Sequence, residues 1–201
     1  MIEARKLSRA YGARSILDLL SWTFPTGTRT HIDAPNGTGK TTLFRCLLGL
    51  EECGGSVAYQ GGPLDAVRDT VGVVFDEPVA YPRLTGARNL ALLSAAAPSD
   101  EAVLAALDLH PRLLARRVSD YSAGERKRLA LGVCLASRPS YVLLDEVDAG
   151  LDVSMRGRVA ELLRQLPWRP TVLLAGHNPP FFESIADEVV RLNAGRLERA
   201  A

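Results

Sequence analysis

Short apolar stretches separated by turn residues dominate the first third of the chain. Apolar or β-branched residues gather at positions 2–6, 16–24 and 28–33. Tyr11-Gly12 and Pro25-Thr26-Gly27 separate these stretches, and both are typical of turns. We therefore expect three β-strands there. Two similar stretches, residues 56–60 and 71–75, predict two further strands.

Helical spacing replaces this pattern in two regions. Leu43, Phe44, Leu47 and Leu48 would share one face of a helix over residues 39–49. From residue 82 to residue 138 the pattern is helical throughout, and no strand pattern interrupts it. In this second region we predict Thr85 and Ser99 as helix N-caps. Asp100 and Glu101 would then lie in the first turn of the helix that follows Ser99.

The last third predicts buried strands alternating with helix. Residues 141–144 form a continuous apolar run after Pro139, which is typical of a strand buried on both faces of a parallel sheet. Residues 171–175 form a second such run, and Asp152 can cap a helix over 153–165. Strands at 187–192 and 196–198 would flank a turn at Asn193-Ala194-Gly195. We expect one α/β domain, with a core of residues 1–81 and 139–201 and an inserted helical lobe of about residues 82–138.

Composition narrows the function classes without choosing one. The 201 residues are 47% hydrophobic and 23% charged, with a formal net charge of +1 and no long charge runs. We therefore expect no nucleic-acid partner. No apolar run approaches the 18 residues that span a bilayer, and the start lacks the apolar core of a signal peptide. We expect a soluble chain with any membrane role supplied by a partner. The three cysteines, Cys46, Cys53 and Cys134, have no metal-ligand spacing and suit a reducing compartment.

A glycine-bearing loop follows the strand that ends at Asp33. Residues 34–42 read APNGTGKTT, and a helix that begins at Gly39 would aim backbone N–H groups and its positive end at a polyphosphate. Lys40 would reach the β and γ phosphates, and the Thr41 hydroxyl would ligate Mg²⁺. The usual pattern has glycine where this chain has Ala34. The predicted ATP-binding residues of the loop are Asn36, Gly37, Thr38, Gly39, Lys40, Thr41 and Thr42.

Two acidic residues end the apolar run YVLLDE at residues 141–146. Asp145, at the carboxyl edge of the strand, would face the phosphate loop and hold Mg²⁺, directly or through water. Glu146 is placed to orient or deprotonate an attacking water. A general base of this kind contributes roughly 10²- to 10⁴-fold in rate.

A third segment, YSAGERKR at residues 121–128, gives these two motifs their context. In isolation it could be a capped helix start with a basic, solvated face. With all three segments, in this order, the chain resembles the ATP-binding cassette (ABC) ATPases, the nucleotide-binding subunits of ABC transporters. The resemblance covers nearly the whole chain. It implies a P-loop NTPase core with a parallel sheet, an N-terminal antiparallel β subdomain and an inserted α-helical subdomain.

The resemblance assigns further roles. Ser122, Ala123, Gly124 and Glu125 occupy the signature loop, which in relatives contacts the γ-phosphate bound by the other subunit; relatives commonly carry glutamine where this chain has Glu125. His177 matches the switch histidine, which positions the attacking water, so the implied catalytic residues are Glu146, His177 and Lys40. Asp152 lies in the loop that crosses the dimer interface in relatives, and Tyr11 matches the aromatic residue that stacks on adenine. His31 and His110 match no motif, and we expect structural roles for both.

Two departures from the family pattern bear on mechanism. Relatives have a glutamine that reaches Mg²⁺ and water where this chain has Asp76. A carboxylate can ligate Mg²⁺ more strongly than an amide, so we expect hydrolysis to survive with an altered metal dependence. Relatives usually carry proline and a small polar residue where this chain has Val147 and Asp148, which changes details of the interface.

The resemblance implies an ATPase with ATP and Mg²⁺ as cofactors that dimerises around two ATP molecules, by default as a homodimer. A membrane-spanning subunit would dock at residues 76–84, from Asp76 to Leu84, and would hold the chain on the cytoplasmic face of the membrane. The compact chain is similar to the ATP-binding subunits of small exporters, including the haem-exporter type. An exporter is therefore our expectation.

Two alternatives stay open at this point. A soluble ABC protein without a transport role, for example in iron–sulfur assembly, would use the same nucleotide clamp. Co-purification with soluble proteins instead of a polytopic membrane protein would favour that reading. A GTPase or a kinase with a P-loop is the third class, but the NKxD segment of guanine-specific GTPases is absent from the sequence, and that class leaves YSAGERKR unexplained.

Overall fold

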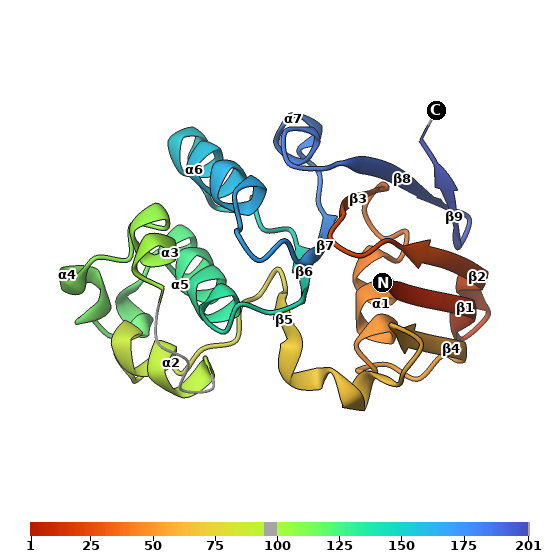
Figure 1. The fold of residues 1–201 in the computed structure, drawn as a ribbon, viewed down its shortest axis with the longest axis horizontal. Coiled ribbons are helices and arrows are strands. Elements are labelled where there is room, and N and C mark those ends of the chain that lie inside the picture. The colour runs from red at the N-terminus through yellow and green to blue at the C-terminus, as the bar shows by residue number, and fades with distance from the viewer. Residues whose placement is uncertain (95–99, 201) are drawn as a thin grey trace.

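Two β-sheets and the helices around them make up the computed structural model, which describes residues 1–94 and 100–200 (Figure 1). The smaller sheet contains β1 (Ile2–Tyr11), β2 (Arg14–Phe24) and β4 (Gly54–Tyr59) in the order β2-β1-β4, with antiparallel pairing. The predicted antiparallel sheet near the N-terminus is therefore confirmed. The pairing of β1 with β2 continues to Tyr11 opposite Arg14, well beyond the predicted end of the first strand. Lys6, with φ 52°, lies at an irregularity that interrupts the apolar pattern.

The larger sheet has the order β5-β6-β7-β3-β8-β9. All neighbours pair in parallel except β8 and β9, which form a hairpin through Ala194 and Gly195, both at positive φ. The central strands β6 and β7 are buried at every position, as their continuous apolar runs predict. The bounds are β3 (Arg29–Asp33), β5 (Val71–Val74), β6 (Tyr141–Asp145), β7 (Thr171–Ala175), β8 (Glu188–Asn193) and β9 (Arg196–Arg199).

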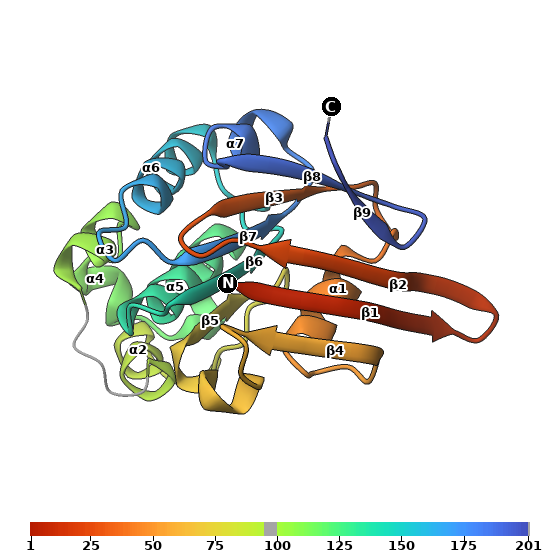
Figure 2. The ribbon, with the colours of Figure 1, turned by 45° about the vertical axis from the view of Figure 1, so that its right-hand side comes forward.

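Helices cover both faces of the larger sheet. Helix α1 (Lys40–Leu47) lies between the two sheets, where its Leu43 and Phe44 share a buried cluster with Leu143 of β6 and residues of β1 and β2. Helices α6 (Val153–Arg164) and α7 (Pro179–Glu183) pack on the opposite face with Leu144 (Figure 2). Alternate residues of β6 thus enter different cores, which confirms a layered α/β fold.

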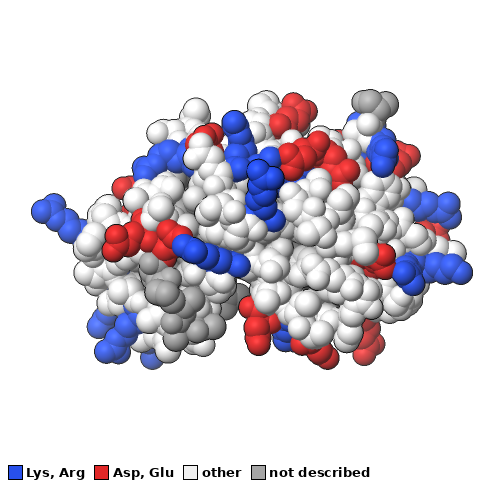
Figure 3. All heavy atoms as spheres, in the orientation of Figure 1, with Lys and Arg blue, Asp and Glu red and all other residues white. Residues whose placement is uncertain are grey.

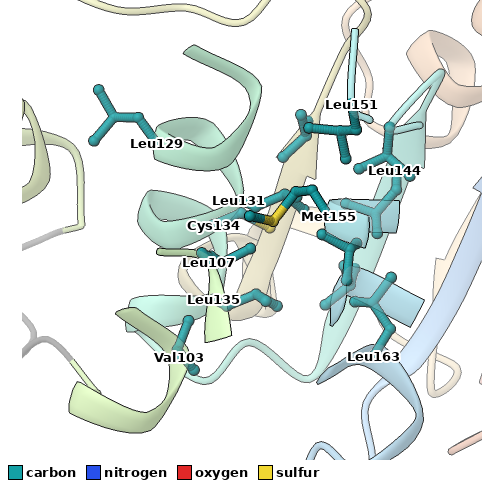
Figure 4. Close-up of a cluster of buried hydrophobic side chains, with 14 of the residues drawn as sticks. Val103, Leu107, Leu129, Leu131, Cys134, Leu135, Leu144, Leu151, Met155 and Leu163 are labelled. Carbon is teal, nitrogen blue, oxygen red and sulfur yellow. The ribbon is translucent and has the colours of Figure 1, made fainter. Parts of the chain in front are cut away.

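Between β5 and β6 the described residues form four helices: α2 (Gly86–Leu93), α3 (Glu101–Ala106), α4 (Pro111–Leu114) and α5 (Ala123–Ala136). Single 3₁₀ turns occur at Leu64–Ala66, Arg68–Thr70 and Val118–Asp120. Figure 4 shows α5 facing β6 and α6 across Cys134, Leu135, Leu144, Met155 and Leu163. This apolar contact fixes the direction in which the amino end of α5 points. The limits of a helical lobe at residues 82 and 138 stay a prediction.

One of the two predicted N-caps, Thr85, is confirmed. Thr85 caps α2, because its hydroxyl accepts from the amide of Arg88 at 3.3 Å. Ser99 lies outside the described residues, and Asp100, predicted for the first turn, is instead the N-cap of α3 and accepts from the amide of Ala102. This placement corrects the prediction by one residue. His110 has a structural role, since its Nδ1 accepts from the amide of Leu113 at 3.1 Å and caps α4.

Acidic and basic side chains are scattered over the face that Figure 3 shows, as the near-zero net charge leads one to expect. Within the described residues, no helix combines the length and the apolar character that crossing a membrane requires.

Candidate active site

The phosphate loop and the predicted catalytic and metal residues gather at the carboxyl ends of four adjacent strands of the larger sheet. The phosphate loop follows β3, Glu146 follows β6 directly, and His177 stands two residues after β7. Asp76 follows β5 at the edge of the same group. The carboxyl ends of parallel strands share one edge, so these segments meet although they are far apart in sequence.

The phosphate loop owes its shape to two glycines. Gly37 and Gly39 have φ values of 72° and 113°, a region that favours glycine. A Cβ on Gly39 would also lie 2.5 Å from Cγ2 of Ile16. Ala34 has no such constraint: its φ is not positive, and its carbonyl accepts from Lys40 Nζ at 2.6 Å. Alanine at the first loop position is therefore compatible with the loop.

A pocket of about 270 Å³ opens above this loop. It is lined by Tyr11, Arg14, Ile16, Asn36, Gly37, Gly39, Lys40, Thr41, Thr42 and Glu146. Six of the seven predicted loop residues are in this lining. Thr38 is not, and its hydroxyl donates to the carbonyl of Pro35 at 2.7 Å. The sequence-based grouping of Tyr11 and Glu146 with the loop agrees with this geometry.

Lys40, Glu146 and His177 converge at one point. His177 Nε2 lies 3.0 Å from Glu146 Oε1 and 3.1 Å from Lys40 Nζ. Burial lowers the pKa of Lys40, while the negative charges of Glu146 and Asp145 oppose the shift. A cation, a carboxylate and an imidazole thus share one partly buried spot next to the phosphate loop.

The environment of Glu146 is unusual for a carboxylate. Burial raises its pKa to about 7, and the negative charges of Asp145, Asp148 and Asp76 add to the shift while Lys40 opposes it. Its backbone has φ 51°, so the residue sits in the left-handed region immediately after β6. Its amide donates to the carbonyl of Ala175 at 2.8 Å and anchors this conformation to β7. A carboxylate with a pKa near neutrality is suited to accept a proton from water.

Thr41 and Asp145 form the pair of oxygen ligands expected for a divalent cation. The Thr41 hydroxyl donates to Asp145 Oδ2 at 2.6 Å, and Asp145 is 1% exposed. Burial raises the pKa of Asp145, against the opposing hydrogen bond from Thr41. Its other oxygen, Oδ1, is buried and has no hydrogen-bond partner within the described part of the chain. Because Mg²⁺ prefers oxygen ligands, this donor set fits the ion.

Asp76 lies at the margin of this group. Its side chain is 64% exposed, and Oδ1 lies 3.4 Å from Lys127 Nζ. Its charge raises the pKa values of both Asp145 and Glu146, so it acts electrostatically on the same site. The structure therefore places Asp76 beside the predicted metal residues, with a lysine as its contact.

Tyr11 stands at the mouth of the pocket. The residue is 45% exposed, and its hydroxyl donates to Glu51 Oε1 at 2.8 Å. The guanidinium of Arg9 lies over the ring, 4.8 Å from its centre. Arg14 also lines the pocket and donates to the carbonyl of Gly37 at 2.7 Å. Sequence reasoning missed Arg14, which follows a turn and carries no motif.

The amino end of α5 carries the segment compared with the signature loop. Ser122 is the N-cap: its hydroxyl accepts from the amide of Glu125 at 3.1 Å, and its own amide donates to Glu125 Oε2 at 2.7 Å. This capping box explains why a glutamate fits here. Glu125 also accepts from Arg116 at 2.9 Å. Ser122 and Ala123 remain exposed.

The loop before α6 lies against this helix start. A Cβ on Gly124 would come within 2.6 Å of the Gly150 carbonyl, so glycine is required by a contact within the chain. Asp152 caps α6, as predicted, by accepting from the amide of Met155 at 2.8 Å. Val153, the next residue, is 81% exposed. Two of the segments predicted to meet a partner therefore share one surface.

Val147 and Asp148, the two residues after Glu146 that differ from the family pattern, have different environments. Val147 is fully buried in the core beside α5 and α6. Asp148 has one buried oxygen without a hydrogen-bond partner in the described residues, 3.1 Å from where a Cβ on Gly176 would lie. This carboxylate adds negative charge between Glu146 and the loop of His177.

Sequence reasoning missed Lys127 as well. In the segment ERKR it looks like one more residue of a basic, solvated face, but the residue is 3% exposed and its Nζ reaches the ends of β5 and β6. Only the packing of α5 reveals the direction of this side chain.

Known proteins match this chain along almost its whole length. The family model described as ABC transporter matches residues 17–149. Curated relatives include Fe(3+) ions import ATP-binding protein FbpC 1 of Rhodococcus jostii, 33% identical over 98% of this chain and 60% of its own length. Sulfate/thiosulfate import ATP-binding protein CysA of Bordetella parapertussis is 34% identical over 98% of this chain and 61% of its own length. The chain thus spans about three fifths of these relatives.

Solved structures share the fold. A dimeric ATP-binding cassette in a post-hydrolysis state, bound to ADP and Pi, has a TM-score of 0.87 at 22% identity and covers 99% of this chain and 97% of its own. A bacterial Atm1-family ABC exporter with ATP bound has a TM-score of 0.87 at 23% identity and covers 98% of this chain and 38% of its own. The family model, the curated relatives and the fold agree, and the chain belongs to the ABC transporter family.

Proposed function

We propose that this chain hydrolyses ATP and thereby powers transport by a separate membrane-spanning subunit. The observation that carries the proposal is the contact of His177 Nε2 with both Lys40 Nζ, at 3.1 Å, and Glu146 Oε1, at 3.0 Å, at the carboxyl edge of the sheet. Membership of the ABC transporter family and relatives that are named ATP-binding proteins support it.

The chemistry follows from the positions of these groups. Loop amides and Lys40 would hold the phosphates, with Tyr11 stacked on the adenine. Glu146 would accept a proton from the attacking water, and His177 would hold that water or the γ-phosphate in line. Thr41 and Asp145 would hold Mg²⁺, with Asp76 nearby; when bound, the ion neutralises phosphate charge.

We propose further that two chains, by default identical, share each ATP. Ser122 and Ala123 are exposed at a helix start, where the helix dipole favours an anion. The phosphate of a second chain would occupy that position, with Asp152 and the loop before it along the same interface.

The membrane-spanning partner would dock on residues 76–84. Val79 is 80% exposed and Tyr81 is 52% exposed, although both are large and apolar. The backbone at Tyr81 is anchored, because the fully buried Asn89 of α2 bonds both the amide and the carbonyl of Tyr81, at 2.7 and 3.1 Å. Two exposed apolar side chains beside an anchored stretch of backbone suit a protein contact.

The direction of transport is a separate question. FbpC and CysA are named import proteins, whereas the exporter neighbour, at 23% identity, supports the fold alone. The sequence-based expectation of an exporter stays a prediction.

Phosphate release from ATP tests the catalytic proposal, with Lys40→Met as the inactive comparison. Docking is tested by the fraction of tagged chain that sediments with membranes of its native cells. Val79→Arg should lower that fraction, while Leu19→Arg, which alters a 59% exposed leucine on β2, should not. Equal sedimentation of both variants would contradict docking at residues 76–84.

A further inference from the structure

Lysine is rare in this chain. The sequence has 24 lysines and arginines, and only Lys6, Lys40 and Lys127 are lysines. Lys6 is exposed on β1, whereas Lys40 and Lys127 are 6% and 3% exposed. Lys40 has its place in the phosphate loop. The second buried lysine has no role in the mechanism described above.

The ammonium group of Lys127 is surrounded by backbone carbonyls at the edge of the site. Nζ donates to the carbonyl of Asp76 at 2.8 Å and to that of Glu146 at 3.0 Å. Longer contacts reach the carbonyl of Phe75 at 3.5 Å and Asp76 Oδ1 at 3.4 Å. One side chain therefore joins the residues that follow β5 and β6.

These contacts connect three parts of the molecule. Lys127 lies on α5 just over one turn from Ser122, at the helix start proposed to meet the partner's nucleotide. Glu146, whose carbonyl it holds, is the proposed base for the nucleotide of its own chain. Asp76 begins the segment 76–84 that is proposed to meet the membrane subunit. All three proposed contacts converge on one buried cation.

A compact ammonium suits this position better than a guanidinium. Lys127 directs its hydrogen bonds to the carbonyls of Asp76 and Glu146, which follow different strands. Arginine presents a flat, wider fork of donors, so it is a poor substitute in a closely packed site. Use of lysine here, in a chain that otherwise uses arginine almost throughout, indicates a demand on shape as well as charge.

From this geometry we infer that Lys127 is a positioning residue for ATP hydrolysis: it holds the segments after β5 and β6 to α5, and so sets Glu146 and Asp76 relative to the signature loop. The inference rests on the proposed function. It predicts that Lys127 affects the rate of the chemical step and leaves nucleotide binding by the phosphate loop intact.

Three variants test this role. Lys127→Met removes the donors and keeps most of the side-chain length, Lys127→Gln keeps a shorter donor without charge, and Lys6→Met is the matched control. Turnover and KM are measured with ATP, and affinity with a fluorescent ATP analogue. We expect Lys127→Met to lower kcat at least tenfold with the analogue Kd within twofold of the parent. The kcat of Lys127→Gln should be at least threefold higher than that of Lys127→Met, and the kcat of Lys6→Met should match the parent within twofold.

Amide hydrogen exchange gives a readout that does not depend on turnover. In Lys127→Met, amides of residues 75–77 and 146–150 should exchange at least tenfold faster, while those of β1 stay unchanged. If the parent chain did not hydrolyse ATP, the proposed function would fail, and the exchange data would still decide whether Lys127 holds these segments.

Two results would overturn the inference: kcat of Lys127→Met within twofold of the parent, or a loss of kcat matched by an equal loss of analogue affinity. If Lys127→Met does not fold, Lys127→Gln carries the test. That variant should then show kcat at least threefold below the parent with unchanged affinity, and parent-like kcat and exchange would overturn the inference.

Discussion

The phosphate loop and the start of α5 both present a helix amino end, yet they differ in how much of a site each chain completes. At α1, the loop is joined by Glu146 and His177 from two other strands, and Lys40 contacts His177 at 3.1 Å. At α5, Ser122 and Glu125 satisfy each other, and Ala123 faces solvent. The groups of the proposed catalytic site contact one another at the start of α1, whereas the start of α5 is a capped, exposed surface.

This difference separates two kinds of requirement. The groups around α1 are ionisable side chains in contact with His177, and the ends of three strands bring them together. The start of α5 needs only a stable shape and free space in front of its amides, which the capping box provides. In the proposed dimer, a site divided in this way would couple hydrolysis to the association of two chains.

The largest expected effect is at the catalytic half. Glu146→Gln should lower kcat by roughly 10²- to 10⁴-fold, because the proposed general base is lost. The KM for ATP should change little, since the amide preserves shape and Lys40 still holds phosphate. Steady-state phosphate release measures both, and normal turnover by this variant would remove Glu146 from the mechanism.

The exposed start of α5 can be altered by a substitution that does not destabilise the helix. Ala123→Glu puts a negative charge in the first turn of α5, where it favours the helix dipole but repels a partner's phosphate. We expect a turnover loss of about 10²-fold, the scale of removing a preorganised anion contact. Ala102→Glu, an equal change in the exposed first turn of α3, is the control and should retain parent activity. Parent-like turnover by Ala123→Glu would contradict a shared site.

The pH dependence of ATP hydrolysis tests the raised pKa of Glu146. Because burial raises the pKa of Glu146 to about 7, kcat/KM should rise with pH and level off above that value. A single group of this pKa implies about a tenfold fall between pH 8 and pH 6. A profile that is flat over this range would show that Glu146 does not act as the base.

The same shift predicts a stability effect of defined sign. A carboxyl whose pKa is raised by folding binds more protons in the native state, so its cost appears as pH rises from the unfolded value near 4.5 through about 7. Glu146→Gln avoids this cost. Its free energy of unfolding should match that of the parent at pH 4.5 and exceed it at pH 8, by up to about 3 kcal/mol. Chemical denaturation at both pH values measures the difference.

A substitution of Asp76 tests whether this residue belongs to the predicted Mg²⁺ site. Asp76→Gln should keep hydrolysis but change the Mg²⁺ concentration for half-maximal rate severalfold, because a charged oxygen beside Asp145 is lost. Unchanged metal dependence and turnover would place Asp76 outside the metal shell.

The smallest effect concerns the capping box. Glu125→Ala removes the acceptor for the Ser122 amide and the ion pair with Arg116. We expect a loss of about 1 kcal/mol, or about 2–4 °C in Tm for a chain of this size. Glu125→Gln keeps the capping acceptor and should lose less. Equal losses in both variants would assign the effect to the ion pair alone.

Residues at strand ends were predictable because the topology of a parallel sheet dictates where they meet. Buried apolar runs marked β6 and β7, so the sequence alone predicted that Asp145 faces the phosphate loop. The hydrogen bond between Thr41 and Asp145 joins residues 104 positions apart in the sequence.

Side chains whose direction depends on packing were not predictable. Lys127 stands between Arg126 and Arg128 in a basic run, and only the docking of α5 on β6 turns it inward. Likewise, Arg14 and the extension of β1 to Tyr11 depend on pairing across a turn, which a polar stretch conceals.

The oligomeric state of a trapped chain tests the central claim most directly. Glu146→Gln, with ATP and Mg²⁺, should form a dimer by light scattering, and the double variant Glu146→Gln/Ala123→Glu should stay monomeric while it binds the fluorescent ATP analogue as tightly. Dimers of both proteins, or of neither, would contradict a nucleotide shared between the phosphate loop of one chain and the α5 start of another.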